Sequence, residues 1–311
     1  MSLDTVTDIA TSGIGFTLPI LVAASGELVS ERAGVLNLSL EAMMLTGAFA
    51  GVLGAVTTGS PVLGAATAVI AALIFGALQA IWSIGLRADQ IVVGIASNAL
   101  ALGATTYGAR LLLADGKGHS VPGFDALKIP LLHDIPVIGP ALFGQTALGY
   151  LCIAVVAVLA FVFSRRTKLG LVIDAIGEDA VAADRTGLSV RAVRYGCVLL
   201  AAFAAGLGGA QLALSEVHSF SDNMTGGIGY LAVVAVIAGR WRALGVIWAS
   251  VFFGIAQALQ FALPALGVDV PFALLVMLPY LMALLAVAGL IGRQTPPAYL
   301  SVPYDRADRA R

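Results

Sequence analysis

Nine long runs of apolar residues, separated by short polar connections, constrain the fold of this chain more than any other feature. A helix needs about 20 apolar residues to cross the hydrocarbon core of a bilayer, where only helices and closed barrels satisfy their own backbone hydrogen bonds. The sequence therefore predicts an all-α, polytopic integral membrane protein with about eight to ten transmembrane helices, some of them broken. The runs cover residues 13–26, 43–58, 62–86, 90–113, 147–163, 196–214, 229–239, 244–263 and 272–291.

The composition leaves little room for any other part. Of 311 residues, 59% are hydrophobic, so residues 1–311 are predicted to form a single transmembrane domain without a large soluble domain. Runs 13–26 and 229–239 are shorter than a full span and are either half-helices or extended by flanking residues. The amino-terminal sequence MSLDTVTDIA has no Lys or Arg, so no cleaved signal peptide is expected.

The basic residues predict the orientation. If residues 164–195 are cytoplasmic, alternating connections put fourteen Lys and Arg inside and three outside. Because cytoplasmic loops carry the excess of these residues, the N-terminus and loop 114–144 are predicted outside and the C-terminus inside. The inside set is Arg32, Arg87, Arg165, Arg166, Lys168, Arg185, Arg191, Arg194, Arg240, Arg242, Arg293, Arg306, Arg309 and Arg311; the outside set is Arg110, Lys117 and Lys128.

The sequence has no recognisable motif for binding a metal ion or a nucleotide. The outer loop holds four prolines with His119 and His133, too few ligands for zinc, so a structured loop is the preferred interpretation. Cys152 and Cys197 lie inside apolar runs and are interpreted as small hydrophobic residues. No GxxxxGK[ST] motif is present, so any ATPase activity must belong to another subunit. The net charge of -1 gives no basic surface for nucleic acid.

Small and polar residues mark where helices pack and where they break. GAFAG at residues 47–51 and GLGGA from Gly206 predict close helix packing. The polar segments 25–44 and 219–230 interrupt apolar sequence, and polar backbone at membrane depth survives only beside protein or a water-filled cavity. Such breaks, one in each half, are typical of a repeated transporter core with its pathway near the middle, although no clear sequence repeat is visible.

Polar side chains within the spans are candidates for that pathway. They face protein or a cavity rather than lipid, and each has the alternative role of an interhelical hydrogen bond. Glu41, Arg32 and Glu31 are also candidates for a structural ion network at the inner mouth. The candidate pathway residues are Asn37, Glu41, Gln90, Ser97, Asn98, Gln257 and Gln260.

The stretch VIDAIGEDAVAADRTGLSVRAVRY, residues 172–195, carries seven charged side chains in a chain that is only 11% charged. Gly177 and Gly187 bracket about two helical turns, with Glu178 and Asp179 in the first turn and Ser189 capping the next helix. Because the whole connection 164–195 is longer than ordinary loops, a docking helix on two polar arms is predicted; a solvated loop with incidental helicity is the alternative.

Several segments in collinear order resemble one family along nearly the whole chain. They are ERAGVLNLSLEAMMLTGAFAG, ADQIVVGIASNALALGATTY, AIGEDAVAADRTGLSVRAVRY, DNMTGGIGYLAVVAVIAGRWRALG and LPYLMALLAVAG. Together they resemble the permease subunits of bacterial ABC importers for simple sugars and nucleosides, within the larger group of branched-chain amino acid and ribose permeases. The family commonly has Asn-Pro after Gly-Glu, whereas this chain has Asp179 and Ala180.

The resemblance implies that residues 176–188 are the coupling helix that sits in a groove on the ATPase. The implied partners are a second homologous permease, a cytoplasmic ATP-binding subunit that holds ATP and Mg, and an extracytoplasmic substrate-binding protein. The implied location is the bacterial inner membrane, and the chain itself performs no bond chemistry. The implied coupling residues are Gly177, Glu178, Asp179, Ala182, Ala183, Asp184, Arg185 and Gly187.

The expected solute is a nucleoside or purine-like compound, with a simple sugar or a branched-chain amino acid as the alternative. Two rival functions fit the sequence less well. An ion-driven secondary transporter would need acidic residues deep in several spans, and apart from Glu41 they are almost absent. An intramembrane enzyme would need a nucleophile or metal motif, and neither HExxH nor GxSxG is present.

Overall fold

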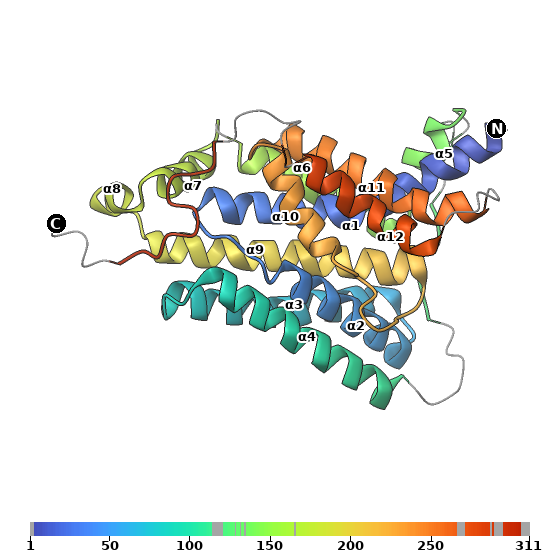
Figure 1. Ribbon diagram of the computed structural model, residues 1–311, viewed down its shortest axis with the longest axis horizontal. Helices are drawn as coiled ribbons and strands as arrows, with labels where there is room; N and C mark the ends of the chain where they lie inside the picture. Colours follow the sequence, from blue (N-terminus) through green and yellow to red (C-terminus); the bar gives the residue numbers. More distant parts are fainter. Residues whose placement is uncertain are drawn as a thin grey trace.

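The computed structural model describes residues 3–113, 121–127, 129–130, 132–133, 135–164, 166–265, 271–286, 288 and 295–305. Helices dominate this part of the chain, as predicted (Figure 1). In order they are α1 (Leu3–Arg32), α2 (Leu40–Thr58), α3 (Pro61–Ala80), the π-helical turn η1 (Ile81–Gly85), α4 (Gln90–Leu112), α5 (Ile138–Phe143), α6 (Ala147–Val162), α7 (Lys168–Glu178), α8 (Ala180–Arg185), α9 (Val190–Gln211), the π-helical turn η2 (Leu212–Val217), α10 (Ile228–Ala238), α11 (Ala243–Ala265) and α12 (Phe272–Leu285).

Within the described part of the chain, six helical segments are long and apolar enough to cross a membrane. Three further apolar helices, α6, α10 and α12, are shorter. Run 13–26 is part of a longer helix, because α1 extends beyond it to Arg32. Run 229–239 corresponds to the short helix α10. The six long segments are Val6–Arg32, Leu40–Thr58, Pro61–Gly85, Gln90–Leu112, Val190–Val217 and Ala243–Gln260.

Helix α9 lies at the centre of the bundle and packs against α1, α2 and α3. Its buried face consists largely of alanine and glycine, which let neighbouring backbones approach closely. A Cβ atom on Gly47 of α2 would lie 3.1 Å from the Cα of Gly206 in α9, and one on Gly209 would collide with the Met44 carbonyl. These glycines therefore allow the close helix packing that the sequence predicted.

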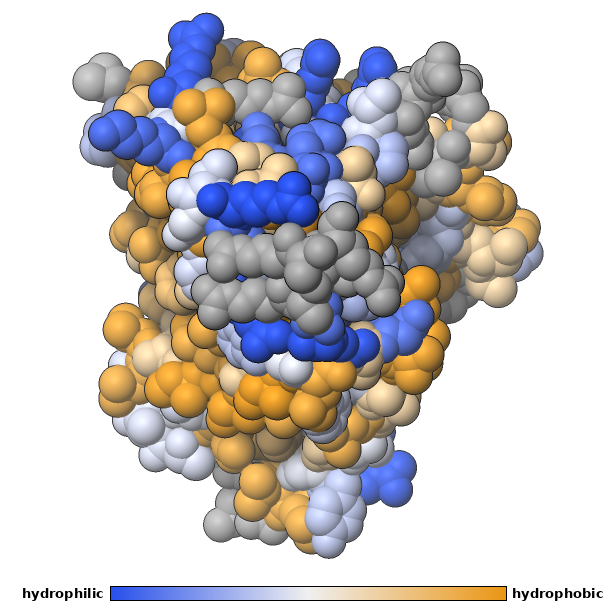
Figure 2. Space-filling model, turned by 90° about the vertical axis from the view of Figure 1, so that its left-hand side faces the viewer, coloured by the Kyte–Doolittle hydropathy of each residue, from blue (hydrophilic) through white to orange (hydrophobic). Residues whose placement is uncertain are grey.

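Hydrophilic residues gather at one end of the bundle (Figure 2). Helices α7 and α8 and the C-terminus lie at one end, and the start of α1 and α5 lie at the other (Figure 1). Figure 2 looks onto the α7–α8 end and shows hydrophilic residues gathered there, with hydrophobic residues around them. Arg110, near the end of α4, is at the opposite end. Several residues of the predicted orientation lie outside the described residues: Lys117, Lys128, Arg165, Arg293, Arg306, Arg309 and Arg311, together with His119 and the rest of residues 114–120.

Residues 295–305 cross back over the α7–α8 end, which the sequence did not predict. The Tyr299 N–H donates to the Gly177 carbonyl at 2.8 Å, and the Ser301 N–H donates to the Gly34 carbonyl at 3.1 Å. Asp305 forms an ion pair with Arg87. This segment ties α7 to the end of α1.

Candidate functional site

The chain leaves helical geometry between α1 and α2, at residues 33–39, here called the first break. The Asn37 N–H donates to Glu27 Oε1 at 2.9 Å, and the Leu36 N–H donates to Gln90 Oε1 at 2.8 Å. These side chains satisfy backbone groups that the helices cannot reach, as membrane depth requires. The break is shorter than the predicted 25–44, because Glu27 lies within α1.

A second break, residues 218–227, precedes α10. It ends in Gly226 and Gly227, whose φ angles are +49° and +97°. Left-handed backbone of this kind suits glycine, because glycine has no Cβ. The turn aims the N–H groups at the start of α10 toward α2.

Glu41, in the first turn of α2, joins the second break to the first. Its Oε1 accepts hydrogen bonds from Thr225 Oγ1 at 2.6 Å and the Gly227 N–H at 2.9 Å, and its Oε2 accepts from the Gly229 N–H at 2.7 Å. A carboxylate at a helix N-terminus is stabilised by the free N–H groups and by the helix dipole. Glu41 thus caps α10 from another helix, with only 6% of its surface exposed.

Asn98 of α4 performs the matching role at the start of α2. Its Oδ1 accepts from the Ala42 N–H at 2.8 Å, and its Nδ2 donates to the Leu38 carbonyl at 3.0 Å. The same Nδ2 group donates to the hydroxyl of Tyr230 in α10. Two polar side chains, Glu41 and Asn98, therefore hold the N-terminal ends of α10 and α2 close together.

A cavity of about 450 Å³ lies where these groups meet. Tyr230 and Tyr280 are 38% and 37% exposed, so their rings offer surface to a ligand. The Tyr280 hydroxyl donates to the Gly226 carbonyl of the second break. Apolar residues of α4 that border the cavity are exposed, so the polar site has no complete wall within the described chain. Its polar lining comes from Glu41, Asn98, Asn223, Tyr230 and Tyr280.

The structure places two of the predicted pathway residues, Glu41 and Asn98, on this cavity. Asn37 and Gln90 are buried and hold the first break instead. Ser97 is buried on α4, and its Oγ has no hydrogen-bond partner among the described residues. Gln257 and Gln260 lie on α11, away from the cavity lining.

Three lining residues, Asn223, Tyr230 and Tyr280, were not singled out from the sequence. Asn223 and Tyr230 lie in the polar segment 219–230 that was recognised as a break. Tyr280 follows Pro279 in an apolar run. The one sequence feature that could have pointed to it is its hydroxyl group among aliphatic residues.

The predicted ion network of Glu41, Arg32 and Glu31 is wrong. Arg32 forms an ion pair with Asp174 of α7 at 2.7 Å, and Glu31 accepts a hydrogen bond from Trp241 Nε1 at 2.6 Å. Each of the three residues therefore has a different partner: Glu31 and Arg32 are neighbours at the end of α1 but contact different elements, and Glu41 lies beyond the first break in α2.

The polar segment 168–188, here called the coupling segment, is more helical than predicted. Its first arm is helix α7, and Glu178 ends α7 rather than starting the next helix. Asp179 caps α8 by accepting from the N–H groups of Val181 at 3.0 Å and Ala182 at 2.9 Å. Gly187 has a φ of +92°, as expected of a terminator. Ser189 precedes α9, but its side chain makes no capping hydrogen bond.

Helix α8 has one buried face and one free face. Ala180, Ala183 and Asp184 are buried, and the alanines pack in a cluster with Ile176 and Tyr304. Ala182 and Arg185 are exposed, with Glu178, Asp179 and Gly187, at the end of the molecule. The surface that α8 can offer a partner therefore includes Ala182 and not Ala183.

The coupling segment is connected to the first break through few groups. A Cβ on Gly177 would collide with the Arg32 carbonyl, so α7 and the end of α1 are in direct contact. Arg194 of α9 donates to the Ala33 carbonyl and to the Val302 carbonyl, each at 3.0 Å. A displacement of α8 thus has a short mechanical route to residues 33–39.

Among the described residues, no group of three or more His, Cys, Asp or Glu side chains is placed to hold a metal ion. Cys152 and Cys197 are both free and buried, each within an apolar cluster. The chemistry available at the cavity is therefore hydrogen bonding and aromatic contact.

Comparison with known proteins finds transport permeases that match this chain over nearly its full length. The family model of the permease component of branched-chain amino acid transport systems matches residues 9–287. The guanosine ABC transporter permease protein NupQ of Bacillus subtilis is 35% identical over 94% of this chain and 95% of its own. The nucleoside ABC transporter permease protein NupC of Lactococcus lactis is 32% identical over 93% and 94%.

One further relative is named for sugar transport. The putative glucose ABC transporter permease protein TsgC13 of Haloferax volcanii is 36% identical over 78% of this chain and 73% of its own. No solved structure matches the chain at a significant level.

Proposed function

Because this chain belongs to the family of permease components of branched-chain amino acid transport systems, we propose that it is the transmembrane permease subunit of an ATP-driven importer. As a multi-pass membrane protein it would form half of the path for a small polar solute. The observation that carries this proposal is the meeting of two broken segments at Glu41, beside a cavity lined by tyrosine, asparagine and glutamate.

The proposed solute is a nucleoside or purine-like compound. Two full-length relatives carry guanosine or nucleoside transport in their names. Tyr230 and Tyr280 suit a planar base, because aromatic rings stack on bases, and Asn98 and Asn223 suit hydrogen bonds to base or ribose. A simple sugar is the second candidate, favoured by the glucose permease relative; a branched-chain amino acid is the third.

The partners follow from the division of labour in such an importer. A second, homologous permease would cover the open side of the cavity, where polar groups cannot face lipid. A cytoplasmic subunit would bind ATP and Mg, since this sequence has no phosphate loop. An extracytoplasmic binding protein would deliver solute at the outer face. The proposed location is the bacterial inner membrane.

The orientation rests on the basic residues. Coupling segment 168–188, within residues 164–195, is proposed to face the cytoplasm, and residues 114–144 the outside. The ATPase would then contact the exposed face of α8, where Ala182 and Arg185 lie. ATP-driven closure would move α8, and Arg194 and Gly177 would pass that movement to the first break.

Uptake by the reconstituted complex tests the solute. Proteoliposomes containing both permeases and the ATPase, with the binding protein outside, should accumulate labelled guanosine when ATP is inside. Unlabelled nucleosides should compete, whereas glucose and leucine should not. Competition by glucose alone would move the assignment to sugars, and ATP hydrolysis by the isolated chain would contradict the permease assignment.

A further inference from the structure

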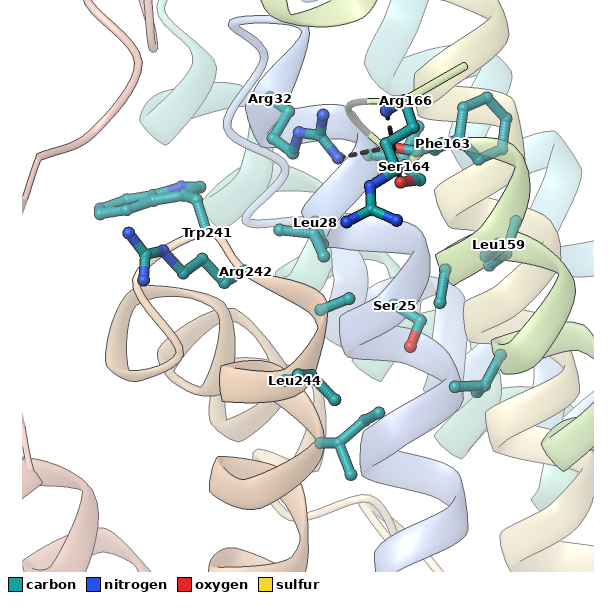
Figure 3. A pocket seen from close by; sticks show the side chains of 15 residues that line it. Ser25, Leu28, Arg32, Leu159, Phe163, Ser164, Arg166, Trp241, Arg242 and Leu244 are labelled. Carbon is teal, nitrogen blue, oxygen red and sulfur yellow. Dashed lines mark hydrogen bonds between the residues drawn. The ribbon is translucent and has the colours of Figure 1, made fainter. Parts of the chain in front are cut away.

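A second cavity, of about 520 Å³, lies beside the end of α1 and shares no lining residue with the first. Helix α1 forms its floor through Ser25, Leu28 and Val29, and α6 and α11 form its two walls (Figure 3). From Ser25 to Arg32 the floor extends about 10 Å along the helix axis. It is long enough for a polar headgroup at one end and the start of an acyl chain behind it.

The two wall helices of the groove carry exposed apolar side chains: Phe161 of α6 is 77% exposed, and Leu244 and Trp248 of α11 are each 73% exposed. Leu244 and Trp248 are one turn apart, so this face of α11 is apolar along its length. Surfaces of this kind are covered by acyl chains in a membrane protein, and tryptophan is typical of the membrane interface.

The rim of the same groove is basic. Figure 3 shows the Arg166 guanidinium over the middle of the cavity, with Arg32 directed toward it from α1. Arg32 is already engaged, with Asp174 and with the Phe163 carbonyl at 2.7 Å. The Arg166 guanidinium has no such partner among the described residues. Arg242 stands at the opposite rim, where its side chain points away from the cavity.

We propose that this groove binds one anionic phospholipid, whose phosphate is held by Arg166 at the rim, and whose acyl chain lies along Leu28, Leu159 and Ile247. Arginine binds phosphate oxygens with two parallel hydrogen bonds, and basic pockets between membrane helices at the cytoplasmic side suit such headgroups. The apolar floor has no use in binding a free anion, so the combination of rim and floor favours a lipid.

The site is independent of the solute assignment. A nucleoside or sugar is uncharged and has no anionic group for Arg166 to hold, and the groove shares no lining residue with the first cavity. The basic rim is also beside α7, so a bound lipid would touch the connection between α6 and the coupling segment at Phe163 and Ser164.

The test measures thermal unfolding and lipid retention of the purified full-length chain in detergent. Dioleoyl phosphatidylglycerol should raise the midpoint of thermal unfolding and remain bound in native mass spectra, because a ligand that binds only the folded state stabilises it. Dioleoyl phosphatidylcholine and inorganic phosphate, at the same concentration, should do neither.

Two variants and a matched control locate the site. Arg166→Ala should weaken phosphatidylglycerol binding by about tenfold, since a charge-assisted bidentate contact is lost. Ala160→Trp should weaken it similarly by filling the groove while leaving every arginine in place. Arg191→Ala removes an exposed arginine of α9 at the same end of the molecule and should leave binding unchanged.

Equal stabilisation by phosphatidylcholine would overturn the proposal, because the rim would then contribute nothing. Stabilisation by inorganic phosphate that survives Ala160→Trp would show a free-anion site and would also overturn it. Unchanged binding in Arg166→Ala and Ala160→Trp, both folded with normal unfolding midpoints without lipid, would place the lipid elsewhere.

Discussion

The two breaks in the helical bundle are built alike but surrounded differently. Each is closed by polar side chains from another part of the chain: Gln90 and Glu27 reach the first break, and Glu41 reaches the second. The first break is largely buried, tied to α9 through Arg194 and to the coupling segment through residues 295–305. Much of the second is exposed and borders the cavity.

This difference indicates a division of roles. A buried break with fixed contacts to the cytoplasmic end is suited to transmit movement, whereas an exposed break beside tyrosines is suited to contact solute. Glu41 belongs to both, because it starts α2 directly after the first break and accepts hydrogen bonds from the second. Variants at each break, and at Glu41 between them, therefore test the two roles separately.

The largest effect is expected at Glu41. Glu41→Ala leaves the Thr225 hydroxyl and the N–H groups of Gly227 and Gly229 without their acceptor. Each unpaired buried donor costs about 1–3 kcal/mol, so the free energy of unfolding should fall by about 3 kcal/mol or more and uptake should be lost. Thermal unfolding and guanosine uptake by the complex are the measurements.

Glu41→Gln is the matched control for charge. It keeps nearly the same volume and one acceptor oxygen, which can serve Thr225 and Gly227, but sets its NH2 group against the Gly229 N–H, so it should lose less stability than Glu41→Ala. If Glu41→Ala itself were as stable and active as the original protein, the two breaks would not depend on their junction, and the division of roles would fail.

The next effect concerns the free face of α8. Ala182→Arg adds a charge to an exposed position that is proposed to meet an apolar groove on the ATPase. Burying an unpaired charge costs several kcal/mol, so uptake should fall by at least about tenfold while the protein level stays normal. Solute-stimulated ATPase activity should fall with it, because docking is lost.

Ala192→Arg is the control for that change, since Ala192 is exposed on α9 outside the coupling segment. It should transport normally. Ala183→Arg should instead lower the level of folded protein, because Ala183 is buried within the chain. Normal uptake by the Ala182→Arg complex would mean that α8 does not dock.

A smaller effect is expected at the second break. Tyr280→Phe keeps the ring but removes the hydroxyl that donates to the Gly226 carbonyl. A lost hydrogen bond of this kind is worth about 0.5–1.5 kcal/mol, so the KM for guanosine uptake should rise about two- to tenfold with little change in maximal rate. Tyr107→Phe, on the exposed surface of α4 away from the cavity, should have no effect. Equal KM values for both variants would mean that the Tyr280 hydroxyl and its hydrogen bond to Gly226 do not shape the solute site.

Much of this architecture could be predicted from the sequence, because apolar runs report burial in lipid directly. The runs located the helices, the polar interruptions located both breaks, and the glycines bracketed α8. Helix α7 was missed as a helix because it lies within a connection that was interpreted as polar arms, although most of its residues are apolar. Its buried residues Gly170, Ile173, Ile176 and Gly177 nevertheless repeat every three or four positions, which was a usable signal.

The pairing of residues far apart in the chain could not be predicted. Glu41 and Gly229 are far apart in the sequence, and no local pattern in either segment names the other as its partner. The same holds for residues 295–305, whose contacts with Gly177 and Gly34 are made by backbone groups. A polar residue in an apolar run signals a buried partner or a cavity, but its type does not say which.

The smallest effect is expected at Ser97, and it tests that last distinction directly. The sequence treats Ser97 and Asn98 alike, as neighbouring polar residues in one span, whereas in the structure Asn98 lines the cavity and Ser97 is buried without a hydrogen-bond partner among the described residues. Replacing an unpaired hydroxyl by hydrogen leaves no donor or acceptor unsatisfied, so Ser97→Ala should change the free energy of unfolding by less than about 0.5 kcal/mol. Uptake should stay within about twofold, while Asn98→Ala, which removes the cap on α2, should reduce it more strongly. A loss of uptake in Ser97→Ala as large as that in Asn98→Ala would mean that the solute path reaches behind α4, and the cavity at Glu41 would then be only part of it.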